Sequence, residues 1–232
     1  MDRIKVTEEE ARVIEEQTKQ QSTSARWKEE REWRVTASTF GAICKATDRR
    51  NMTALATSIL YPPHFTVPSL THGLAHEPTA IKKFTEITGK KVTACGLYIY
   101  VAHPFLAASP DGLTEDGGLV EVKCPYKGRQ KEIRPEFFSE FFPFLEENAG
   151  KITLKKNSSY MYQIQGQMKI CNRSHCYFVV YTFCDIHIEA IAFDECFFNT
   201  NMFLPLKEFY EEHYLPLIAK NMGKPRNIVT KK

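Results

Sequence analysis

The chain lacks any apolar run long enough to cross a membrane. Its longest apolar stretches, 137–145 and 176–184, fall well short of the roughly 20 residues that a transmembrane helix requires. No apolar signal-peptide segment follows the charged start Met1–Lys5, which leads directly into an acidic stretch. We therefore expect a protein without a membrane partner.

Paired or regularly spaced cysteines are also absent. The seven cysteines include no C-x-x-C pair, and most stand in apolar strand or helix patterns, where a free thiol behaves as a small hydrophobic group. This arrangement argues against a disulfide-stapled secreted scaffold. It favours a reducing, intracellular compartment: the nucleus in a eukaryote and the cytoplasm otherwise.

Internal repeats, low-complexity linkers and shifts in composition are missing as well. With 232 residues, 43% of them hydrophobic, the chain can bury a full core within one large domain. We expect a single domain over 1–232, in which an N-terminal helix within 1–24 and a basic tail at 220–232 are peripheral extensions.

The net charge of +3 is modest, but the distribution of charge is informative. Five glutamates among the first twenty residues mask a basic remainder, and the last thirteen residues carry five positive charges and no acid. Further basic clusters occupy 26–34, 45–50, 127–134 and 151–156. Each cluster alone is typical of a solvated face, whereas several clusters around a carboxylate site indicate a groove that follows phosphates.

Hydrophobic periodicity and breaker residues predict an α/β fold with a central mixed sheet flanked by helices. Helices are expected at about 7–21, 36–45, 51–60, 69–88, 158–172 and 194–219, and strands at about 91–101, 105–110, 118–124, 176–184 and 186–193. The phenylalanine-rich segment 135–147 is interpreted as a helix or a compact insertion.

The most informative pattern is Ser-Pro-Asp-Gly, followed by a turn and the strand Leu-Val-Glu-Val-Lys-Cys, within 109–124. Side chains alternate along a strand, so Glu121 and Lys123 share one side, and Asp111 arrives from the neighbouring hairpin arm. Two carboxylates form a hard oxygen site for Mg²⁺ or Mn²⁺, and the lysine can hold an attacking water or offset transition-state charge. The pattern predicts a metal-dependent phosphodiesterase, although Asp-Gly turns and Glu-Val-Lys strand faces also occur without catalysis.

Two other places carry groups suited to this chemistry. In the helix at 69–88, Glu77 falls on a largely apolar stripe, where a buried carboxylate needs a partner or a metal. The alternative is that Glu77 lies at the edge of the stripe and reaches solvent or His76. Arg31 and Ser38 stand near a predicted helix start, which is a ready site for an anion. The alternative there is that Ser38 is an ordinary helix cap.

The helix at 158–172 contains three glutamines within five residues. Gln163 and Gln167 share a face with Tyr160, whereas Gln165 lies on another side. Such glutamines can orient water or contact nucleic-acid bases and backbone. They can equally decorate the surface of a helix without a role in chemistry.

The chain resembles the lambda exonuclease / YqaJ-like viral recombinase family, within the PD-(D/E)xK nuclease superfamily. The resemblance rests on Ser-Pro-Asp-Gly-Leu (109–113) and Glu-Val-Lys-Cys-Pro (121–125). It is supported by the segment from Arg31 through Thr36-Ala-Ser38, by Gly73-Leu-Ala-His-Glu77 and by Tyr160-Met-Tyr-Gln-Ile-Gln165. Order and spacing agree from about residue 27 to about residue 193. The resemblance implies a restriction-endonuclease-like core, a central mixed sheet flanked by helices.

The resemblance also implies a role for each residue of the central motif. Asp111 and Glu121 would hold the divalent cation, Mg²⁺ or Mn²⁺, with help from the Val122 carbonyl. Glu77 would support this metal site or a second metal. Lys123 would position or activate the attacking water. The catalytic set implied in this way includes three carboxylates and one lysine.

The outer motifs receive roles in the same way. Gln165 matches the glutamine that orients the lysine or the water near the scissile phosphate, and Gln163 is a second candidate for that role. Arg31 and Ser38 would form the pocket for the terminal 5′-phosphate of the cut strand. Arg34 is an alternative to Arg31, because only spacing decides between them.

Members of this family typically degrade one strand of linear duplex DNA from 5′ to 3′ and leave a 3′ overhang for a single-strand-annealing partner; some form trimers. Lys127 and Arg129 are further candidates for DNA contacts. We therefore predict a metal-dependent 5′→3′ exonuclease acting on double-stranded DNA ends in recombination or repair. The alternatives are a structure-specific DNA endonuclease, an RNA-cleaving nuclease on the same fold, or a non-catalytic nucleic-acid-binding module.

Overall fold

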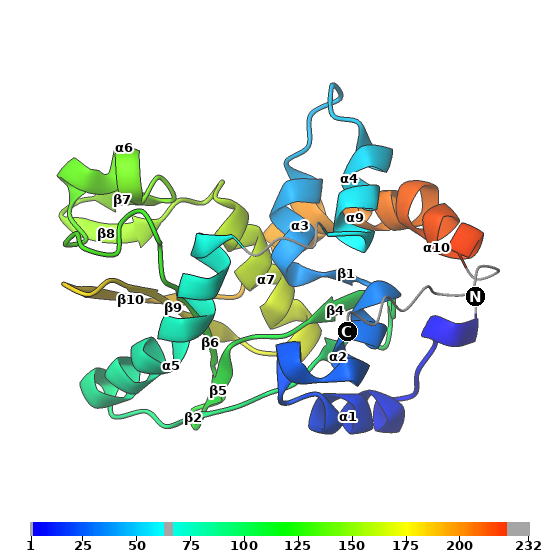
Figure 1. Cartoon of the computed structure of the whole chain (residues 1–232), viewed down its shortest axis with the longest axis horizontal. Helices are drawn as coiled ribbons and strands as arrows, with labels where there is room; N and C mark the ends of the chain where they lie inside the picture. The colour runs from blue at the N-terminus through cyan, green and yellow to red at the C-terminus, as the bar shows by residue number, and fades with distance from the viewer. Residues whose placement is uncertain (1, 63–66, 222–232) are drawn as a thin grey trace, which may run out of the picture.

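The computed structural model describes residues 2–62 and 67–221, which form three β-sheets surrounded by helices (Figure 1). The helices are η1 (Asp2–Ile4), α1 (Glu8–Gln17), η2 (Gln21–Thr23), α2 (Ala25–Glu32), α3 (Ala37–Cys44), α4 (Met52–Leu60), α5 (Pro68–Thr88), η3 (Pro135–Phe137), α6 (Phe138–Phe141), α7 (Ser159–Cys171), α8 (Glu195–Phe198), η4 (Asn199–Phe203), α9 (Leu204–Glu208), η5 (Phe209–Tyr214) and α10 (Leu215–Asn221). The strands are β1 (Val35–Thr36), β2 (Val92–Thr93), β3 (Tyr98–Ile99), β4 (Leu106–Ala108), β5 (Gly112–Thr114), β6 (Leu119–Lys123), β7 (Leu145–Asn148), β8 (Lys151–Leu154), β9 (His175–Tyr181) and β10 (Ile186–Ala192).

The largest sheet has five strands in the order β10-β9-β6-β5-β2. Strands β6 and β9 run parallel, with Glu121 opposite Phe178 and Lys123 opposite Val180, while the other neighbouring pairs are antiparallel. A second sheet has the order β1-β4-β3, and β7 pairs with β8 in a separate hairpin. The predicted mixed sheet flanked by helices is confirmed.

Helices cover both faces of the central sheet (Figure 1). On one face, Ala80 and Phe84 of α5 form a buried cluster with Val120 and Val122 of β6. The main core, which includes buried residues of α3, α7 and the C-terminal helices, fills the other face. Alternation along β6 therefore points Val120 and Val122 toward α5 and Glu121 toward α7, as the sequence pattern predicts.

Two glycines allow α3 and α7 to pack closely. A Cβ atom on Gly41 of α3 would lie 2.5 Å from the Cα atom of Ser159, and one on Gly166 of α7 would lie 2.3 Å from the ring of Phe40. Neither distance leaves room for a methyl group. The close approach fixes α7 relative to the core, and α7 carries the glutamines discussed below.

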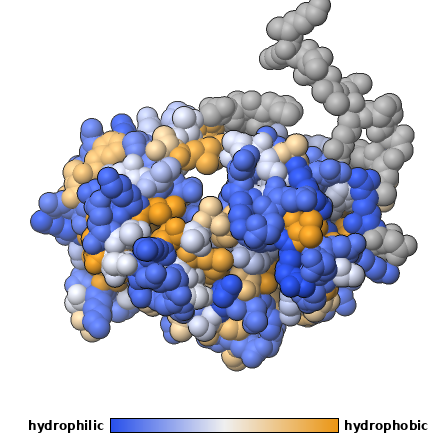
Figure 2. Space-filling view, turned by 90° about the horizontal axis from the view of Figure 1, so that it is seen from below, coloured by the Kyte–Doolittle hydropathy of each residue, from blue (hydrophilic) through white to orange (hydrophobic). Residues whose placement is uncertain are grey.

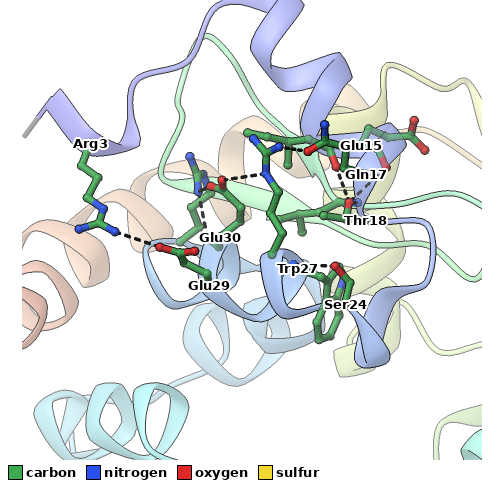
Figure 3. A network of polar contacts seen from close by, with 12 residues as sticks. Arg3, Glu15, Gln17, Thr18, Ser24, Trp27, Glu29 and Glu30 are labelled. Carbon is green, nitrogen blue, oxygen red and sulfur yellow. Dashed lines mark hydrogen bonds and ion pairs between the residues drawn. The ribbon is translucent and has the colours of Figure 1, made fainter. Parts of the chain in front are cut away.

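The N-terminal segment is bound tightly to the rest of the structure, although the sequence places 1–24 at the periphery (Figure 3). Ala11 and Ile14 of α1 are buried against Leu97 and Ile99. The backbone N–H of Leu97 donates to the hydroxyl oxygen of Thr18 at 2.8 Å, and Thr18 itself is fully buried. Helix α1 thus forms part of the core.

The strand predicted at 91–101 is divided into β2 and β3, which belong to different sheets. Between them, the N–H of Gly96 donates to Glu15 Oε1 at 2.8 Å, and the N–H of Leu97 is bonded to Thr18. These side-chain bonds with α1 take the place of the strand-to-strand bonds that a continuous strand would need. Local sequence does not reveal them.

The other predicted elements lie close to the observed ones. Helix α5 ends at Gly89, whose left-handed φ of 73° suits a residue without a Cβ atom. The segment 135–147 contains η3, α6 and the start of β7, which is the compact insertion expected as one alternative. The final helix is interrupted by the π-helical turns η4 and η5. Of the expected basic tail, 222–232 lies outside the described residues.

All seven cysteines are free, in line with the absence of a disulfide pattern. None of the described helices combines the length and the apolar character that spanning a membrane requires.

We expect Gly41→Ala to lower the free energy of unfolding by about 1–3 kcal/mol, because its methyl group must displace the backbone of Ser159. Gly73→Ala in α5 is the matched control. Among the residues that the structure describes, no atom outside the helix's own backbone lies within 4 Å of a Cβ built there, so alanine should raise the free energy of unfolding by about 0.5–1 kcal/mol. Urea titrations of both variants measure these values, and unchanged stability of Gly41→Ala would contradict the close-packing argument.

Candidate active site

The candidate site lies where β5 and β6 pair in the central sheet. Asp111 immediately precedes β5, and its backbone N–H donates to Val120 O at 3.1 Å. Its carboxylate oxygen Oδ2 accepts a bond of 2.7 Å from the N–H of Val122. These two bonds hold the Asp111 carboxylate beside the strand that carries Glu121 and Lys123. The hairpin arrangement predicted from the sequence is present.

Glu121 is 2% exposed, and all of its described partners are hydrogen-bond donors. Its Oε1 accepts from Lys123 Nζ and, at 2.5 Å, from Gln163 Nε2. Its Oε2 accepts from Gln167 Nε2 at 2.7 Å. A buried carboxylate is stable only with such partners, so α7 and β6 share one polar network inside the core.

Gln165 does not join this network, so its expected position beside the catalytic lysine is wrong. Its Nε2 donates to Ala192 O at 3.0 Å, and its Oε1 accepts from the N–H of Asp194 at 2.8 Å. Residues two apart on an α-helix differ by about 200° in direction, so Gln165 must point away from Gln163. The face shared by Gln163 and Gln167 is the one that meets Glu121.

Asp111 and Glu77 are both affected by burial and by like charge. Burial first, and then the charge of Glu121, raise the pKa of each carboxyl, and Glu77 further raises the pKa of Asp111. Glu77 is partly buried on α5. Its position is thus intermediate between the two alternatives from the sequence, a carboxylate buried on the apolar stripe and one at the edge of the stripe that reaches solvent. The charge of Glu121 therefore lies close enough to destabilise the charged forms of Asp111 and Glu77.

Lys123 remains a cation in this setting. Burial alone would lower the pKa of Lys123, but the carboxylates of Glu121 and Asp111 outweigh burial and raise it. The ammonium group also lies 4.8 Å from the centre of the Tyr160 ring, a geometry that favours positive charge. Tyr160 is a neighbour that the sequence placed on the correct face of α7 without assigning it a role.

The residues fit a hard divalent cation by their chemistry. Asp111, Glu121 and Glu77 offer carboxylate oxygens in a desolvated site where their mutual repulsion favours a cation between them. Within 2–62 and 67–221, no group of three or more His, Cys, Asp or Glu side chains already surrounds one point as a metal centre. The Glu121 oxygens face the α7 glutamines and Lys123, which accounts for this.

Arg34 is excluded as a phosphate ligand, contrary to its place as an alternative to Arg31. It is 1% exposed, and its guanidinium donates to the carbonyls of Pro104 and Ile4 and forms an ion pair with Glu30 at 2.6 Å. Four of its five N–H donors are bonded to protein oxygens, and the buried guanidinium supports the core where a ligand has no access to it.

Arg31 differs from Arg34 in having no carboxylate partner among the described residues. Its guanidinium lies over the Trp27 ring, 4.1 Å from the ring centre. Trp27 Nε1 donates in turn to Ser109 Oγ at 2.8 Å, two residues before Asp111. Burial lowers the pKa of Arg31 to about 10, so the group is still charged at neutral pH. Trp27 thus connects the arginine to the segment that carries Asp111.

Ser38 is exposed in the first turn of α3. The preceding Thr36 makes no side-chain capping bond to this turn, and its hydroxyl lies 3.3 Å from that of Ser38. Thr36 holds the N-cap position, so Ser38 lies inside the helix and is not its cap, and no side-chain bond from Thr36 caps the first N–H groups. They remain suited to an anion.

Lys127 and Arg129 follow β6 directly. Lys127 is exposed, while the Arg129 guanidinium lies 4.3 Å from the centre of the Tyr126 ring and donates to the Tyr126 carbonyl at 2.7 Å. Both cations stand near the end of the strand that carries Lys123, as their sequence position predicts.

The surface is hollowed near the middle of one face, between two lobes of the molecule (Figure 2). The hollow lies between the part that contains α5 and the part that contains α1 and α2, with apolar residues along its sides (Figures 1 and 2). Helix α5 carries Glu77, and α2 carries Arg31.

Comparison with known proteins gives a family and related folds. The model of the YqaJ-like viral recombinase domain matches residues 26–174. No curated protein matches the sequence significantly. Among solved structures, the alkaline exonuclease LHK-Exo from Laribacter hongkongensis is 28% identical with a TM-score of 0.62, covering 86% of this chain and 100% of that chain.

Two further structures extend the comparison. LHK-Exo in complex with dAMP gives a TM-score of 0.63 at 28% identity, again covering 86% of this chain and 100% of that chain. A phage-related exonuclease from Haemophilus somnus 129PT, at 16% identity and a TM-score of 0.53, covers 81% of this chain and 96% of that chain. The latter is similar in fold.

We expect Asp111→Asn to stabilise the metal-free protein at pH 8. Burial and neighbouring carboxylates raise the pKa of Asp111 in the folded state above its pKa in the unfolded state. The wild type therefore loses stability as the pH rises from the unfolded-state pKa to the folded-state pKa. Asparagine removes this loss, and the melting temperature should rise by about 2–4 °C per kcal/mol recovered. Thermal melts in EDTA should show the difference at pH 8 and its disappearance near pH 4.

Asp116→Asn is a control of opposite sign. Bonds from Lys90 and Thr114 lower the pKa of Asp116, so its charge stabilises the fold above the unfolded pKa. Its removal should lower the melting temperature at pH 8. A drop for both variants would contradict the assignment of Asp111 as a destabilised carboxylate.

Proposed function

Since this chain belongs to the YqaJ-like viral recombinase family, we propose that it is a divalent-metal-dependent exonuclease that degrades linear double-stranded DNA from a 5′ end in recombination or repair. The observation that carries the proposal is the meeting of Asp111, Glu121 and Lys123 beside β6. The similarity to LHK-Exo over 86% of this chain supports an exonuclease in particular.

In this proposal Asp111 and Glu121 hold Mg²⁺ or Mn²⁺, with the Val122 carbonyl and Glu77 as additional oxygen donors. The bound ion would polarise the scissile phosphate and lower the pKa of an attacking water. The Asp111 carboxylate is already positioned by the Val122 N–H, and Glu121 is positioned by its bonds to α7. These contacts keep both oxygen donors oriented while DNA enters.

Lys123 acts as a fixed positive charge beside the reacting phosphate. In the metal-free protein the neighbouring carboxylates raise the pKa of its ammonium group, so it is a hydrogen-bond donor there. It can hold the attacking water or stabilise negative charge that builds on the phosphate oxygens. Gln163 and Gln167 support this role indirectly, because they share the Glu121 carboxylate with Lys123.

Arg31 and the start of α3 at Ser38 form the subsite for the terminal 5′-phosphate. A guanidinium without a carboxylate partner and a helix N-terminus without a Thr36 side-chain cap both favour a phosphate group. LHK-Exo has been solved in complex with dAMP, a 5′-nucleotide, which supports a ligand that carries a 5′-phosphate.

The remaining partners belong to the same proposal. Degradation from the 5′ end leaves a 3′ overhang, which suits a single-strand-annealing protein. A homotrimer would keep the enzyme on its substrate. We propose both as features of the family, and the mass of the purified protein in solution tests the second.

Lys123→Ala should lower the rate of duplex degradation with Mg²⁺ by about 100-fold or more, because one preorganised charge near the phosphate is lost. Lys82→Ala, an exposed lysine on α5 paired with Glu86, is the matched control and should be unaffected. The measurement is release of nucleotides from end-labelled linear DNA. Equal rates for the wild type and Lys123→Ala would refute the proposed mechanism, and degradation of closed circular DNA would refute the need for an end.

Arg31→Ala should narrow the preference for 5′-phosphate over 5′-hydroxyl ends by about tenfold or more, since a charged hydrogen bond to phosphate is lost. Arg26→Ala on the same helix is the control, because Arg26 is engaged with Gln17 and Glu30. Initial rates on duplexes that differ only in the terminal group measure this preference. A ratio unchanged by Arg31→Ala would remove Arg31 from the subsite.

A further inference from the structure

Four aromatic rings gather just beyond the central strands. His72 and His76 come from α5, Tyr126 follows β6, and Phe183 follows β9. The ring centres of His72 and His76 are 4.4 Å apart, and His72 lies 5.6 Å from both Tyr126 and Phe183. His76 lies 4.9 Å from Phe183. We name these four residues the aromatic cluster.

The topology of the sheet places this cluster near the end of β6 that carries Lys123. Lys123 of β6 is opposite Val180 of β9 in the parallel register. Tyr126 lies three residues after Lys123, and Phe183 lies three residues after Val180. Both therefore lie beyond the same end of the parallel pair β6 and β9. His76 directly precedes Glu77 in α5. The cluster is therefore adjacent to the residues proposed to hold the metal.

Two rings of the cluster are exposed to solvent, and the two histidines are partly buried. Tyr126 is 38% exposed and Phe183 is 49% exposed, although large apolar groups normally seek burial. The four ring contacts are tilted or edge-to-face, with interplanar angles between 54° and 74°. In that arrangement the rings do not cover one another's faces as a parallel stack would.

Positive charge accompanies the rings. The Arg129 guanidinium lies over Tyr126, and the N–H of Phe183 donates to the Arg129 carbonyl at 2.8 Å, which joins the two loops. Lys127 is exposed nearby. Burial, His76 and Arg129 lower the pKa of His72, which favours the neutral form of its ring. The combination of open rings and flanking cations matches the chemistry of single-stranded nucleic acid.

We propose that the aromatic cluster stacks the unpaired bases of a DNA strand that leaves the duplex beside the cut. Exposed aromatic faces bind bases of any sequence, while Arg129 and Lys127 contact the connecting phosphates. The proposal rests on the proposed nuclease function and specifies that the substrate is partly unpaired in the site.

The test is fluorescence anisotropy of labelled duplexes in EDTA, where binding is measured without cleavage. One duplex carries a short single-stranded tail with normal bases, and the other carries the same tail with abasic sites. Phe183→Ala should weaken binding of the normal tail by about fivefold or more and leave the abasic tail unchanged. His76→Ala should behave in the same way.

Leu204→Ala is the matched control, because Leu204 is an apolar side chain that is 56% exposed outside the cluster. It should bind both tails as the wild type does. Equal weakening on normal and abasic tails, or no weakening, would overturn the stacking site.

Cleavage assays with Mg²⁺ keep the two proposals apart. If the wild type cleaves duplex ends but Phe183→Ala binds the normal tail as tightly as the wild type does, only the stacking site is refuted. A wild type that does not cleave, but shows the base-dependent loss, would refute the nuclease and retain the stacking site.

Discussion

The buried carboxylate of Glu121 is the constraint on which the rest of the structure depends. An ionised group at 2% exposure is tolerable only when its oxygens receive hydrogen bonds. Lys123 supplies one donor from the same strand, and Gln163 and Gln167 supply two more from α7. The strand and the helix must therefore pack in a single register, since a shift of either would leave the charge without partners.

This requirement extends outward through the packing of α3 and α7. Gly41 and Gly166 allow these helices to come close enough for α7 to occupy its position over β6. The same packing fixes the start of α3, which carries Ser38. Arg31 is positioned separately, through its contact with Trp27 and the bond from Trp27 to Ser109. Core packing thus sets the relative positions of the two parts of the proposed site. The fold and the proposed site share these contacts.

The sequence predicted the parts of the structure that depend on local periodicity. Period-two alternation in β6 gave the correct faces for Glu121 and Lys123, and helical spacing placed Gln163 and Gln167 together. Gln165 was misplaced because its role came from motif matching, whereas its direction is set by helical geometry and its partners on β10 and beyond.

Long-range contacts explain the remaining differences. Arg34 and Arg31 are equivalent in local sequence, yet only the fold pairs Arg34 with Glu30 and the Pro104 carbonyl. The division of 91–101 likewise depends on Glu15 and Thr18 of the N-terminal segment, about 80 residues away in the chain. Interactions of this range leave no mark in a local hydrophobic pattern.

The connection between β6 and α7 has a consequence for how such chains can diverge. Residues 135–157 build their own small helices and the β7–β8 hairpin, and the cost of closing a loop rises only with the logarithm of its length. Insertions or deletions there can reshape the surface beside the proposed site while Glu121 keeps its partners. A single inserted residue between Gln163 and Gln167 would rotate one of them by about 100° away from Glu121. The segment 135–157 therefore tolerates changes in length, whereas α7 between Gln163 and Gln167 does not.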